Sequence, residues 1–387
     1  MYIFPLDAEN AQAASLLRSF NMLLNLPLEI IDKVFGYLNE KELVKAAQVH
    51  QQLGRAFAYH VGGNYKRLNC CHFVGGTSVL RYTYDELRVI LSLCGSTVVD
   101  ISIKSSDVTD RIGELIKKYC INLESAFIVV TDGNFNAIKR ILGMKGIQKL
   151  GLNSNRYRGS DLLQHINPNC KRLCLIGNTP DQKEHLRQLT NLEKLDVESF
   201  EFRNIFEICS HLKKLRKLMV SGLRDTSQKL NFLYPELEEL SLRYFYIKQE
   251  FPTCPKLKTL RLFYSVCLTE SVAQLILKYA NTLESLILIP KDYEHEFYAK
   301  DLIIVLRNCK SLQFLDTKNS VLKSIFSELL ESFIQILKEN GFSTQKRFKL
   351  VGDLDKTDEL KQELMNKLPN SEVWDLITLT DIKIYCI

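Results

Sequence analysis

Basic and aromatic side chains recur at nearly constant spacing through the middle of this 387-residue chain. Four basic residues share one position of a repeated segment and lie 22 or 23 residues apart: Lys149, Arg172, Lys194 and Lys217. A second group joins cations to aromatic rings: Arg243, Tyr244, Arg261 and Phe263. Arginine and tyrosine are enriched among residues that dominate binding energy, and rows of cations attract acidic partners. The chemistry these residues predict is non-covalent capture of a target, and we assign all eight to target binding.

Patterns that mark covalent catalysis are missing from the sequence. It contains no G-x-S-x-G, P-loop, G-x-G-x-x-G or H-E-x-x-H motif, and its seven histidines are scattered. The cysteine and histidine pairs at 70–72 and 209–211 have no second half at zinc-ligand spacing. We therefore expect a protein that is not an enzyme and that uses no metal or cofactor.

The elements that carry the basic residues are copies of one pattern, L-x-x-L-x-L, between residues 94 and 317. Successive copies are 20 to 29 residues apart, with these middle apolar residues: Ile101, Ala126, Leu150, Leu173, Leu195, Leu218, Leu240, Leu260, Leu286 and Leu315. Alternating apolar residues predict a short strand in each copy. Apolar residues at helical spacing predict return helices at 85–94, 108–119, 269–279 and 300–308.

A period of this length with this pattern is typical of leucine-rich repeats. We predict an α/β leucine-rich-repeat solenoid of about ten repeats over residues 61–322, with a curved parallel sheet inside and helices outside. The residues between the leucines would then point out from the concave sheet. Cys120, Cys254 and Cys309 share one slot with apolar residues of other copies, which indicates a buried position. Residues 323–387 are predicted to be irregular terminal repeats and a C-terminal cap.

Composition fits an ordinary folded protein, with 46% hydrophobic and 25% charged residues. The N-terminus lacks the basic and apolar regions of a secretory signal, and no apolar stretch approaches the roughly 18 residues of a membrane span. These features predict a cytoplasmic or nuclear protein, or both, without a membrane partner. The net charge of +6 is spread along the chain, which disfavours nucleic acid as the partner.

A different pattern precedes the repeats. Pro27 can begin a helix, and the apolar stripe that follows it predicts one short helix. Asn39 with Glu42 forms a capping-box signature for a second helix, and a third is expected from about Gln51. Three short helices make a very small core, so the surplus of apolar residues suggests a permanent partner. The plainer alternative is an N-terminal cap for the repeats.

This region, placed at residues 22–60, resembles the F-box motif. The likeness rests on the Leu-Pro-x-Glu start and the spacing of the apolar residues after it: Leu26, Pro27, Glu29, Ile30, Phe35, Leu38, Leu43 and Val49. His50 and Leu53 depart from it, since cysteine and tryptophan are usual there, and they put the third helix in doubt. The whole chain therefore resembles F-box/leucine-rich-repeat proteins, with a small all-α F-box at its N-terminal end.

The resemblance implies the substrate-recognition subunit of an SCF-type E3 ubiquitin ligase. The F-box would bind the Skp adaptor, which joins a cullin scaffold, and the repeats would capture an unknown protein substrate. The residues assigned to the adaptor-binding face are Leu26, Pro27, Ile30, Ile31, Val34, Phe35, Leu38, Leu43, Ala46 and Val49. Two alternatives remain open: a repeat scaffold that acts without ubiquitin, and a nucleic-acid-binding protein that uses the basic column.

Overall fold

The computed structural model describes residues 22–74, 77–104, 108–177, 183–198, 204–221, 231–247, 251–267, 272–289, 299–317, 319–352, 357–368 and 371–379. The chain divides into two compact units, Met1–Leu152 and Asn153–Ile387. Each unit is built from parallel strands and helices, and the first also contains the helices at the N-terminal end. No helix within these ranges is both long and apolar enough to cross a membrane.

The first unit begins with three helices: α2 (Leu28–Phe35), α3 (Glu40–Val49) and α4 (Gln51–Val61). The predicted capping box is present, because the backbone N–H of Glu42 donates to Asn39 Oδ1 (3.1 Å) and that of Asn39 donates to Glu42 Oε2 (2.8 Å). This exchange satisfies two donors at the start of α3. All three helices expected from the sequence are therefore formed.

The two departures from the F-box pattern do not disturb the third helix. His50 accepts a hydrogen bond at Nδ1 from the backbone N–H of Gln52 (3.1 Å) and so caps the start of α4. Leu53 is buried in the helical core together with Phe57. An apolar residue can fill the site where tryptophan is usual, and a histidine can act as a cap.

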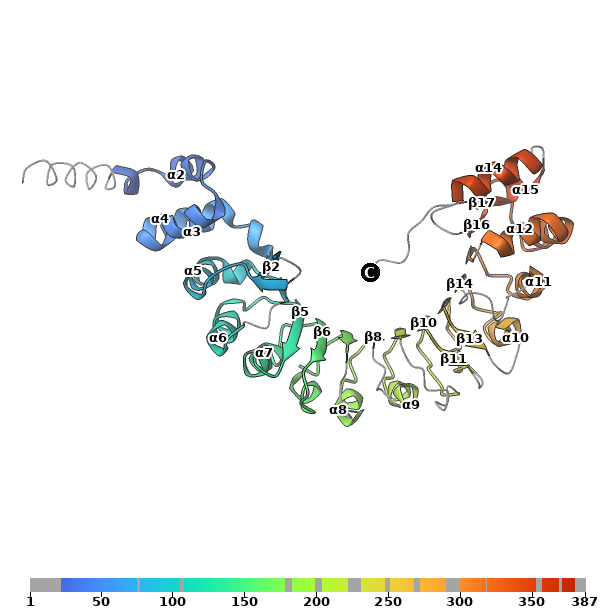
Figure 1. Cartoon of the computed structure of the whole chain (residues 1–387), viewed down its shortest axis with the longest axis horizontal. Helices are drawn as coiled ribbons and strands as arrows, with labels where there is room; N and C mark the ends of the chain where they lie inside the picture. Colours follow the sequence, from blue (N-terminus) through green and yellow to red (C-terminus); the bar gives the residue numbers. More distant parts are fainter. Residues whose placement is uncertain are drawn as a thin grey trace, which may run out of the picture. The chain divides into compact units, whose positions relative to one another are not determined.

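The rest of the first unit supplies the first copies of the repeated pattern. Its further helices are α5 (Tyr84–Cys94), α6 (Asp110–Tyr119) and α7 (Phe135–Leu142), with 3₁₀ turns η1 (Asn64–Lys66) and η2 (Gly95–Thr97). Its strands are β1 (Arg67–Asn69), β2 (Cys71–Val74), β3 (Thr77–Leu80), β4 (Asp100–Ile103) and β5 (Ser125–Thr131). The predicted return helices at 85–94 and 108–119 correspond to α5 and α6. Helices α3 and α4 pack on α5, as the close labels in Figure 1 indicate.

Strand β6 (Lys149–Arg156) spans the boundary between the units, and the second unit continues the alternation. Its strands are β7 (Arg172–Ile176), β8 (Lys194–Glu198), β9 (Lys217–Ser221), β10 (Glu239–Arg243), β11 (Tyr246–Ile247), β12 (Thr259–Phe263), β13 (Val266–Cys267), β14 (Ser285–Ile289), β15 (Phe314–Asp316), β16 (Phe348–Val351) and β17 (Ile377–Leu379). Its helices are η3 (Leu163–His165), α8 (Lys183–Gln188), α9 (Ile205–Ser210), α10 (Val272–Leu277), α11 (Ala299–Asn308), α12 (Asn319–Glu328), α13 (Leu330–Glu339), α14 (Thr357–Lys367) and α15 (Val373–Leu376).

Hydrogen bonding joins thirteen of the described strands into one sheet, in the order β1-β4-β5-β6-β7-β8-β9-β10-β12-β14-β15-β16-β17. The register confirms the alignment of the middle apolar residues. Leu195 pairs with Leu173 and Leu218, and Leu260 pairs with Leu240 and Leu286. Every pairing in this sheet whose register is described is parallel. Each copy therefore contributes one strand in a constant register.

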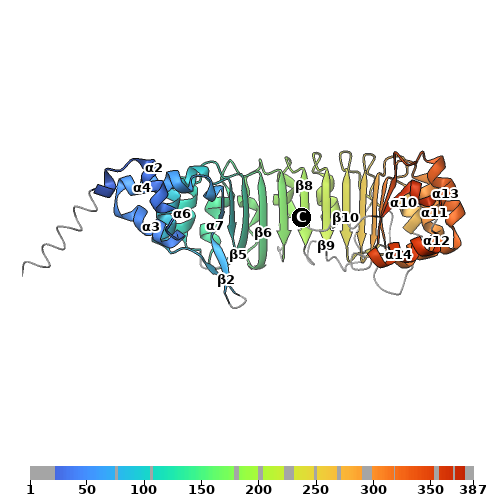
Figure 2. The same cartoon turned by 90° about the horizontal axis from the view of Figure 1, so that it is seen from above.

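Alternation along each strand separates a buried face from an exposed face. In β8, Leu195 and Val197 are fully buried, whereas Lys194, Asp196 and Glu198 are at least partly accessible. In the second unit, α8, α9, α10 and α11 lie on one side of the strands, which run side by side in Figure 2. The leucines pack toward this helical layer, and the opposite side, which we call the open face, carries the intervening residues.

The C-terminal segment differs from the sequence-based expectation in two places. One amphipathic helix was expected over 324–339, but Leu329 leaves helical geometry (φ −128°, ψ 16°) and separates α12 from α13. The rings of Phe326 and Phe333 meet edge to face across this break, with centroids 5.9 Å apart. A strand was expected over 373–379, but only Ile377–Leu379 is a strand, because residues 373–376 form α15. Strands β16 and β17 nevertheless continue the sheet.

Candidate functional site

The structure sorts the predicted adaptor-binding residues by burial. Three of them, Ile31, Phe35 and Leu43, lie inside the helical core, so they hold the helices together and are removed from the docking face. Leu26, Leu38 and Ala46 are half-buried. The exposed members are Pro27, Ile30, Val34 and Val49.

Ile30 and Val34 carry the strongest docking signal. They are 41% and 39% exposed and lie one helical turn apart on α2, so they share one face of that helix. The sequence prediction missed two exposed aromatic residues of the same three-helix region, Tyr37 (91% exposed) and Tyr59. The apolar periodicity could not have singled them out, because it does not distinguish a residue facing the core from one facing a partner.

A polar cluster fixes helix α3 to the segment that follows the three helices. The Glu40 carboxylate accepts hydrogen bonds from the hydroxyls of Tyr65 (3.0 Å) and Tyr82 (2.6 Å), and it forms an ion pair with Arg81. Burial would raise the pKa of the Glu40 carboxyl, but the hydrogen bonds from Tyr82, Tyr65 and Arg81 outweigh it and leave that pKa below its ordinary value. Glu40 is therefore a charged anchor within the first unit.

Three of the four predicted basic residues lie in one row of the second unit. Register places Arg172 opposite Lys194, and Lys194 opposite Lys217, on neighbouring strands β7, β8 and β9. Lys149 is exposed at the start of β6 and belongs to the first unit. The row ends in an acid, because Glu239 of β10 is the next partner of Lys217.

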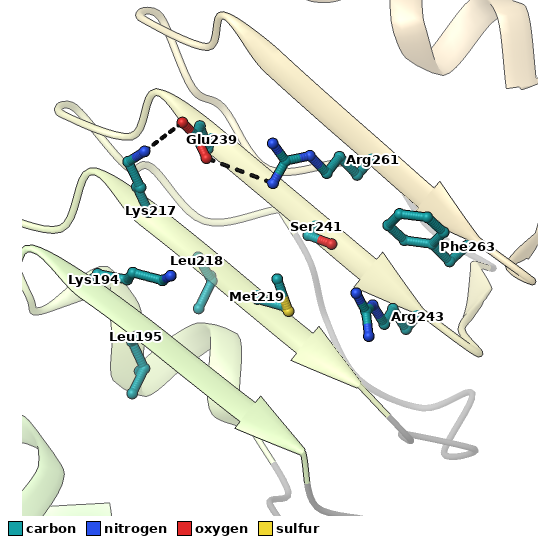
Figure 3. A pocket seen from close by; sticks show the side chains of 10 residues that line it. All are labelled: Lys194, Leu195, Lys217, Leu218, Met219, Glu239, Ser241, Arg243, Arg261 and Phe263. Carbon is teal, nitrogen blue, oxygen red and sulfur yellow. Dashed lines mark hydrogen bonds and ion pairs between the residues drawn. The ribbon is translucent and has the colours of Figure 1, made fainter. Parts of the chain in front are cut away.

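Beside this row the open face holds a pocket of about 210 Å³. Strands β8, β9, β10 and β12 supply its lining: Lys194, Leu195, Lys217, Leu218, Met219, Glu239, Ser241, Arg243, Arg261 and Phe263. The Glu239 carboxylate lies between two cations, 2.6 Å from Lys217 Nζ and 3.6 Å from Arg261 Nη1 (Figure 3). The pocket thus gathers four cations and one carboxylate from four strands.

The remaining cations interact with an acid on β8. Burial raises the pKa of the Asp196 carboxyl, and the positive charges of Lys194 and Arg243 oppose that rise. Arg243 also lies over the ring of Phe263, with its guanidinium carbon 4.9 Å from the ring centroid. The aromatic ring therefore holds the guanidinium against the open face.

Phe263 plays a different part from the one the sequence predicts. It is a predicted target contact, yet its side chain is buried and packs with Ile287, Phe314 and Val351. These residues come from β12, β14, β15 and β16. Phe263 lines the pocket, but it serves there as the support beneath Arg243 and not as a freely exposed contact.

Two exposed tyrosines follow the strands that carry Arg243 and Phe263. The rings of Tyr244 and Tyr264 stack with centroids 5.2 Å apart and an angle of 12° between their planes. Both residues have left-handed backbones, at φ 59° and 52°. The same position after β7 is Gly177, at φ 99°, and in all three copies the N–H donates to the last strand carbonyl of the next copy. Tyrosine thus occupies a conformation that favours glycine.

This strain predicts that glycine is tolerated at position 244. Tyr244→Gly removes left-handed strain of about 1–2 kcal/mol and loses the ring stack and some chain entropy, each about 1 kcal/mol. We expect the free energy of unfolding to stay within about 1 kcal/mol of wild type, whereas Tyr244→Ala keeps the strain and is less stable than Tyr244→Gly. Denaturant unfolding of the three proteins measures this. An alanine variant more stable than the glycine variant would contradict it.

The geometry thus defines a three-helix region with an exposed apolar face, followed by a parallel sheet that bears a cationic pocket. Residues 23–59 match the family model of the F-box domain. No curated protein matches the chain. The chain therefore carries an F-box domain, and F-box domains typically bind a Skp adaptor within SCF complexes.

Proposed function

We propose that this protein is the substrate receptor of an SCF-type ubiquitin ligase. The observation that carries the proposal is the F-box match over residues 23–59 together with the exposed pair Ile30 and Val34 on α2. Burial of apolar side chains of this size gives an adaptor a favourable docking surface. The Skp adaptor binds this face and connects the chain to a cullin scaffold.

The second part of the proposal is a leucine-rich-repeat solenoid that holds the target. Support comes from the constant 20–29-residue pattern and from the register in which its leucines pair along the sheet. The receptor performs no bond chemistry itself. It raises the effective concentration of the target's lysines near the ubiquitin-loaded conjugating enzyme.

An acidic segment of a protein fits the open face better than a nucleic acid does. The basic row is interrupted by Glu239, and Asp196 and Glu198 lie on β8 beside Lys194. A nucleic-acid surface usually presents an unbroken basic stripe, because affinity grows with the number of phosphates neutralised. A mixed row instead suits a partner whose charges alternate in the complementary sense.

Affinity purification of the full chain from cells, followed by mass spectrometry, tests the ligase role. The Skp adaptor and a cullin should be recovered with it, together with a set of further proteins that accumulate when the proteasome is inhibited. Recovery of other partners without adaptor and cullin would instead establish the scaffold reading.

Reversing two charges of the basic row should weaken target capture. In Lys194→Glu/Lys217→Glu, the attraction for an acidic segment is lost and association becomes slower, so we expect at least a fivefold lower target yield at low salt. The difference should shrink as salt rises. The measurement is co-purification of targets at two salt concentrations, with adaptor recovery as the internal standard.

The matched control is Lys213→Glu/Lys214→Glu, which changes the net charge equally in an exposed turn before β9. It should leave the target yield unchanged. Equal losses in both double variants would show that overall charge, not the basic row, governs capture.

A further inference from the structure

Three buried donors in the pocket lack a hydrogen-bond partner among the residues that the structure describes. They are the Ser241 hydroxyl and the Nε groups of Arg243 and Arg261. Ser241 is only 3% exposed, and all three residues line the pocket. A buried donor without an acceptor is destabilising by about 1–3 kcal/mol, so three in one place indicate an acceptor that binds there.

The three donors belong to two adjacent strands. Ser241 pairs in register with Arg261, and Arg243 follows two residues later on the same face of β10. Figure 3 shows the Ser241 side chain between those of Arg261 and Arg243. A carboxylate offers two oxygens, whereas a phosphate monoester offers three strong acceptor oxygens in a tetrahedral arrangement. Three donors on three residues match the second group better.

The charges of the pocket favour the same group. Lys194, Lys217, Arg243 and Arg261 carry four positive charges, and Glu239 neutralises one of them. Asp196, which interacts with Lys194 and Arg243, offsets another, and the more exposed Glu198 acts on Asp196 from outside the lining. About two positive charges are left, close to the −1.5 to −2 of a phosphate monoester at pH 7 and above the single charge of a carboxylate.

Size and surroundings indicate how the phosphate is presented. At about 210 Å³ the pocket is smaller than the 300–1,000 Å³ usual for drug-sized ligands. It suits one modified side chain of a longer partner. The exposed Tyr244 and Tyr264 rings follow directly on the pocket residues Arg243 and Phe263, and they offer an apolar surface for the partner's neighbouring residues.

We propose that this pocket binds the phosphate of a phosphoserine or phosphothreonine in the captured target. This inference rests on the proposed function, because it names the feature by which the receptor recognises its substrate. The Ser241 hydroxyl and the Arg243 and Arg261 guanidinium groups donate to the phosphate oxygens, and Lys194 and Lys217 neutralise its charge. Phosphorylation of the target is then the signal that permits capture.

The test uses the full chain in complex with its Skp adaptor. Three immobilised peptide libraries of identical degenerate flanks carry phosphoserine, serine or glutamate at the centre. We expect the phosphoserine library to be retained at least tenfold better than the other two. Free O-phosphoserine should compete, and inorganic phosphate should compete only at much higher concentration, because it lacks the flanking contacts.

Variants connect this binding to the pocket. Arg243→Gln should reduce phosphopeptide retention at least tenfold, since a charge-assisted hydrogen bond corresponds to about a ten- to hundredfold change in affinity. Ser241→Ala should reduce it several-fold without lowering the melting temperature, because the hydroxyl has no partner to lose among the described residues. Arg172→Gln, on the same face outside the lining, should have no effect.

Several outcomes would overturn the inference. Equal retention of the glutamate and phosphoserine libraries would make the pocket a general acid site. Competition by inorganic phosphate as strong as that by O-phosphoserine would make free phosphate the ligand. Retention of a mixed-sequence RNA that depends equally on Arg243 would assign the pocket to nucleic acid. If Arg243→Gln fails to fold, Ser241→Ala decides. Intact adaptor binding with no phosphopeptide preference would refute the pocket assignment and leave the proposed function standing.

Discussion

Replacing Ile30 and Val34 together with glutamate will weaken binding of the Skp adaptor at least hundredfold. The two side chains share one exposed face of α2, so the change removes apolar surface that the adaptor would cover. It also places two carboxylates where docking must strip them of water. A hundredfold loss corresponds to about 2.7 kcal/mol, which two partly buried aliphatic residues and two desolvated charges readily exceed.

Titration of the purified adaptor by calorimetry or surface plasmon resonance measures this loss. The fold should survive, because both positions face solvent in the free chain, and a thermal melt checks it. Ile121→Glu is the matched control: it makes the same change at an isoleucine that is 67% exposed and lies outside residues 23–59. Adaptor affinity equal to wild type in the double variant would place the docking face elsewhere, first at Tyr37, Val49 and Tyr59.

Replacing Glu40 with alanine should destabilise the first unit by about 2 kcal/mol. The change leaves the hydroxyls of Tyr65 and Tyr82 without their acceptor and Arg81 without its ion-pair partner. Hydrogen bonds to a charged group contribute about 1.5–3 kcal/mol each, but the Glu40 side chain is 34% exposed, so water replaces part of what is lost. Denaturant unfolding followed by a probe in the first unit measures the difference.

The contribution of Glu40 should also depend on pH. Its pKa is lowered in the folded state, so its ionised form stabilises the fold fully above the unfolded pKa of about 4.3. That stabilisation is lost as pH falls through the lower folded pKa. The stability gap between wild type and Glu40→Gln should therefore be constant from pH 8 to about 5 and shrink below about pH 4. The exposed Glu328, changed to glutamine, serves as control. A gap that stays constant down to pH 3 would show that Glu40 acts without its charge.

Local and periodic features of this protein were predictable from the sequence. The register of the strands follows from the spacing of the leucines, because each copy must bury the same apolar positions against its neighbours. The start of α3 follows from Asn39 and Glu42, whose capping box is completed within four residues. The F-box start at Leu26 and Pro27 was recognisable for the same reason, since it is a contiguous pattern.

Sidedness in the N-terminal helices was decided only by tertiary packing. Ile30 and Ile31 are adjacent and chemically identical, yet one is exposed and the other fully buried. Helical periodicity marks a stripe of apolar residues but not which edge of that stripe meets the other helices and which meets a partner. The contact of Glu40 with Tyr65, Arg81 and Tyr82 was equally hidden, because it joins residues up to 42 positions apart.

The pocket shows the same division most clearly. The sequence by itself determined that Lys194, Lys217, Arg243 and Arg261 occupy the exposed positions of successive strands, because strand alternation assigns them to the open face. It could not determine that Glu239 pairs with Lys217 and Arg261, or that Ser241 is buried without a partner among the described residues. Those facts depend on the directions and lengths of side chains from four neighbouring strands, and only the packed sheet fixes them.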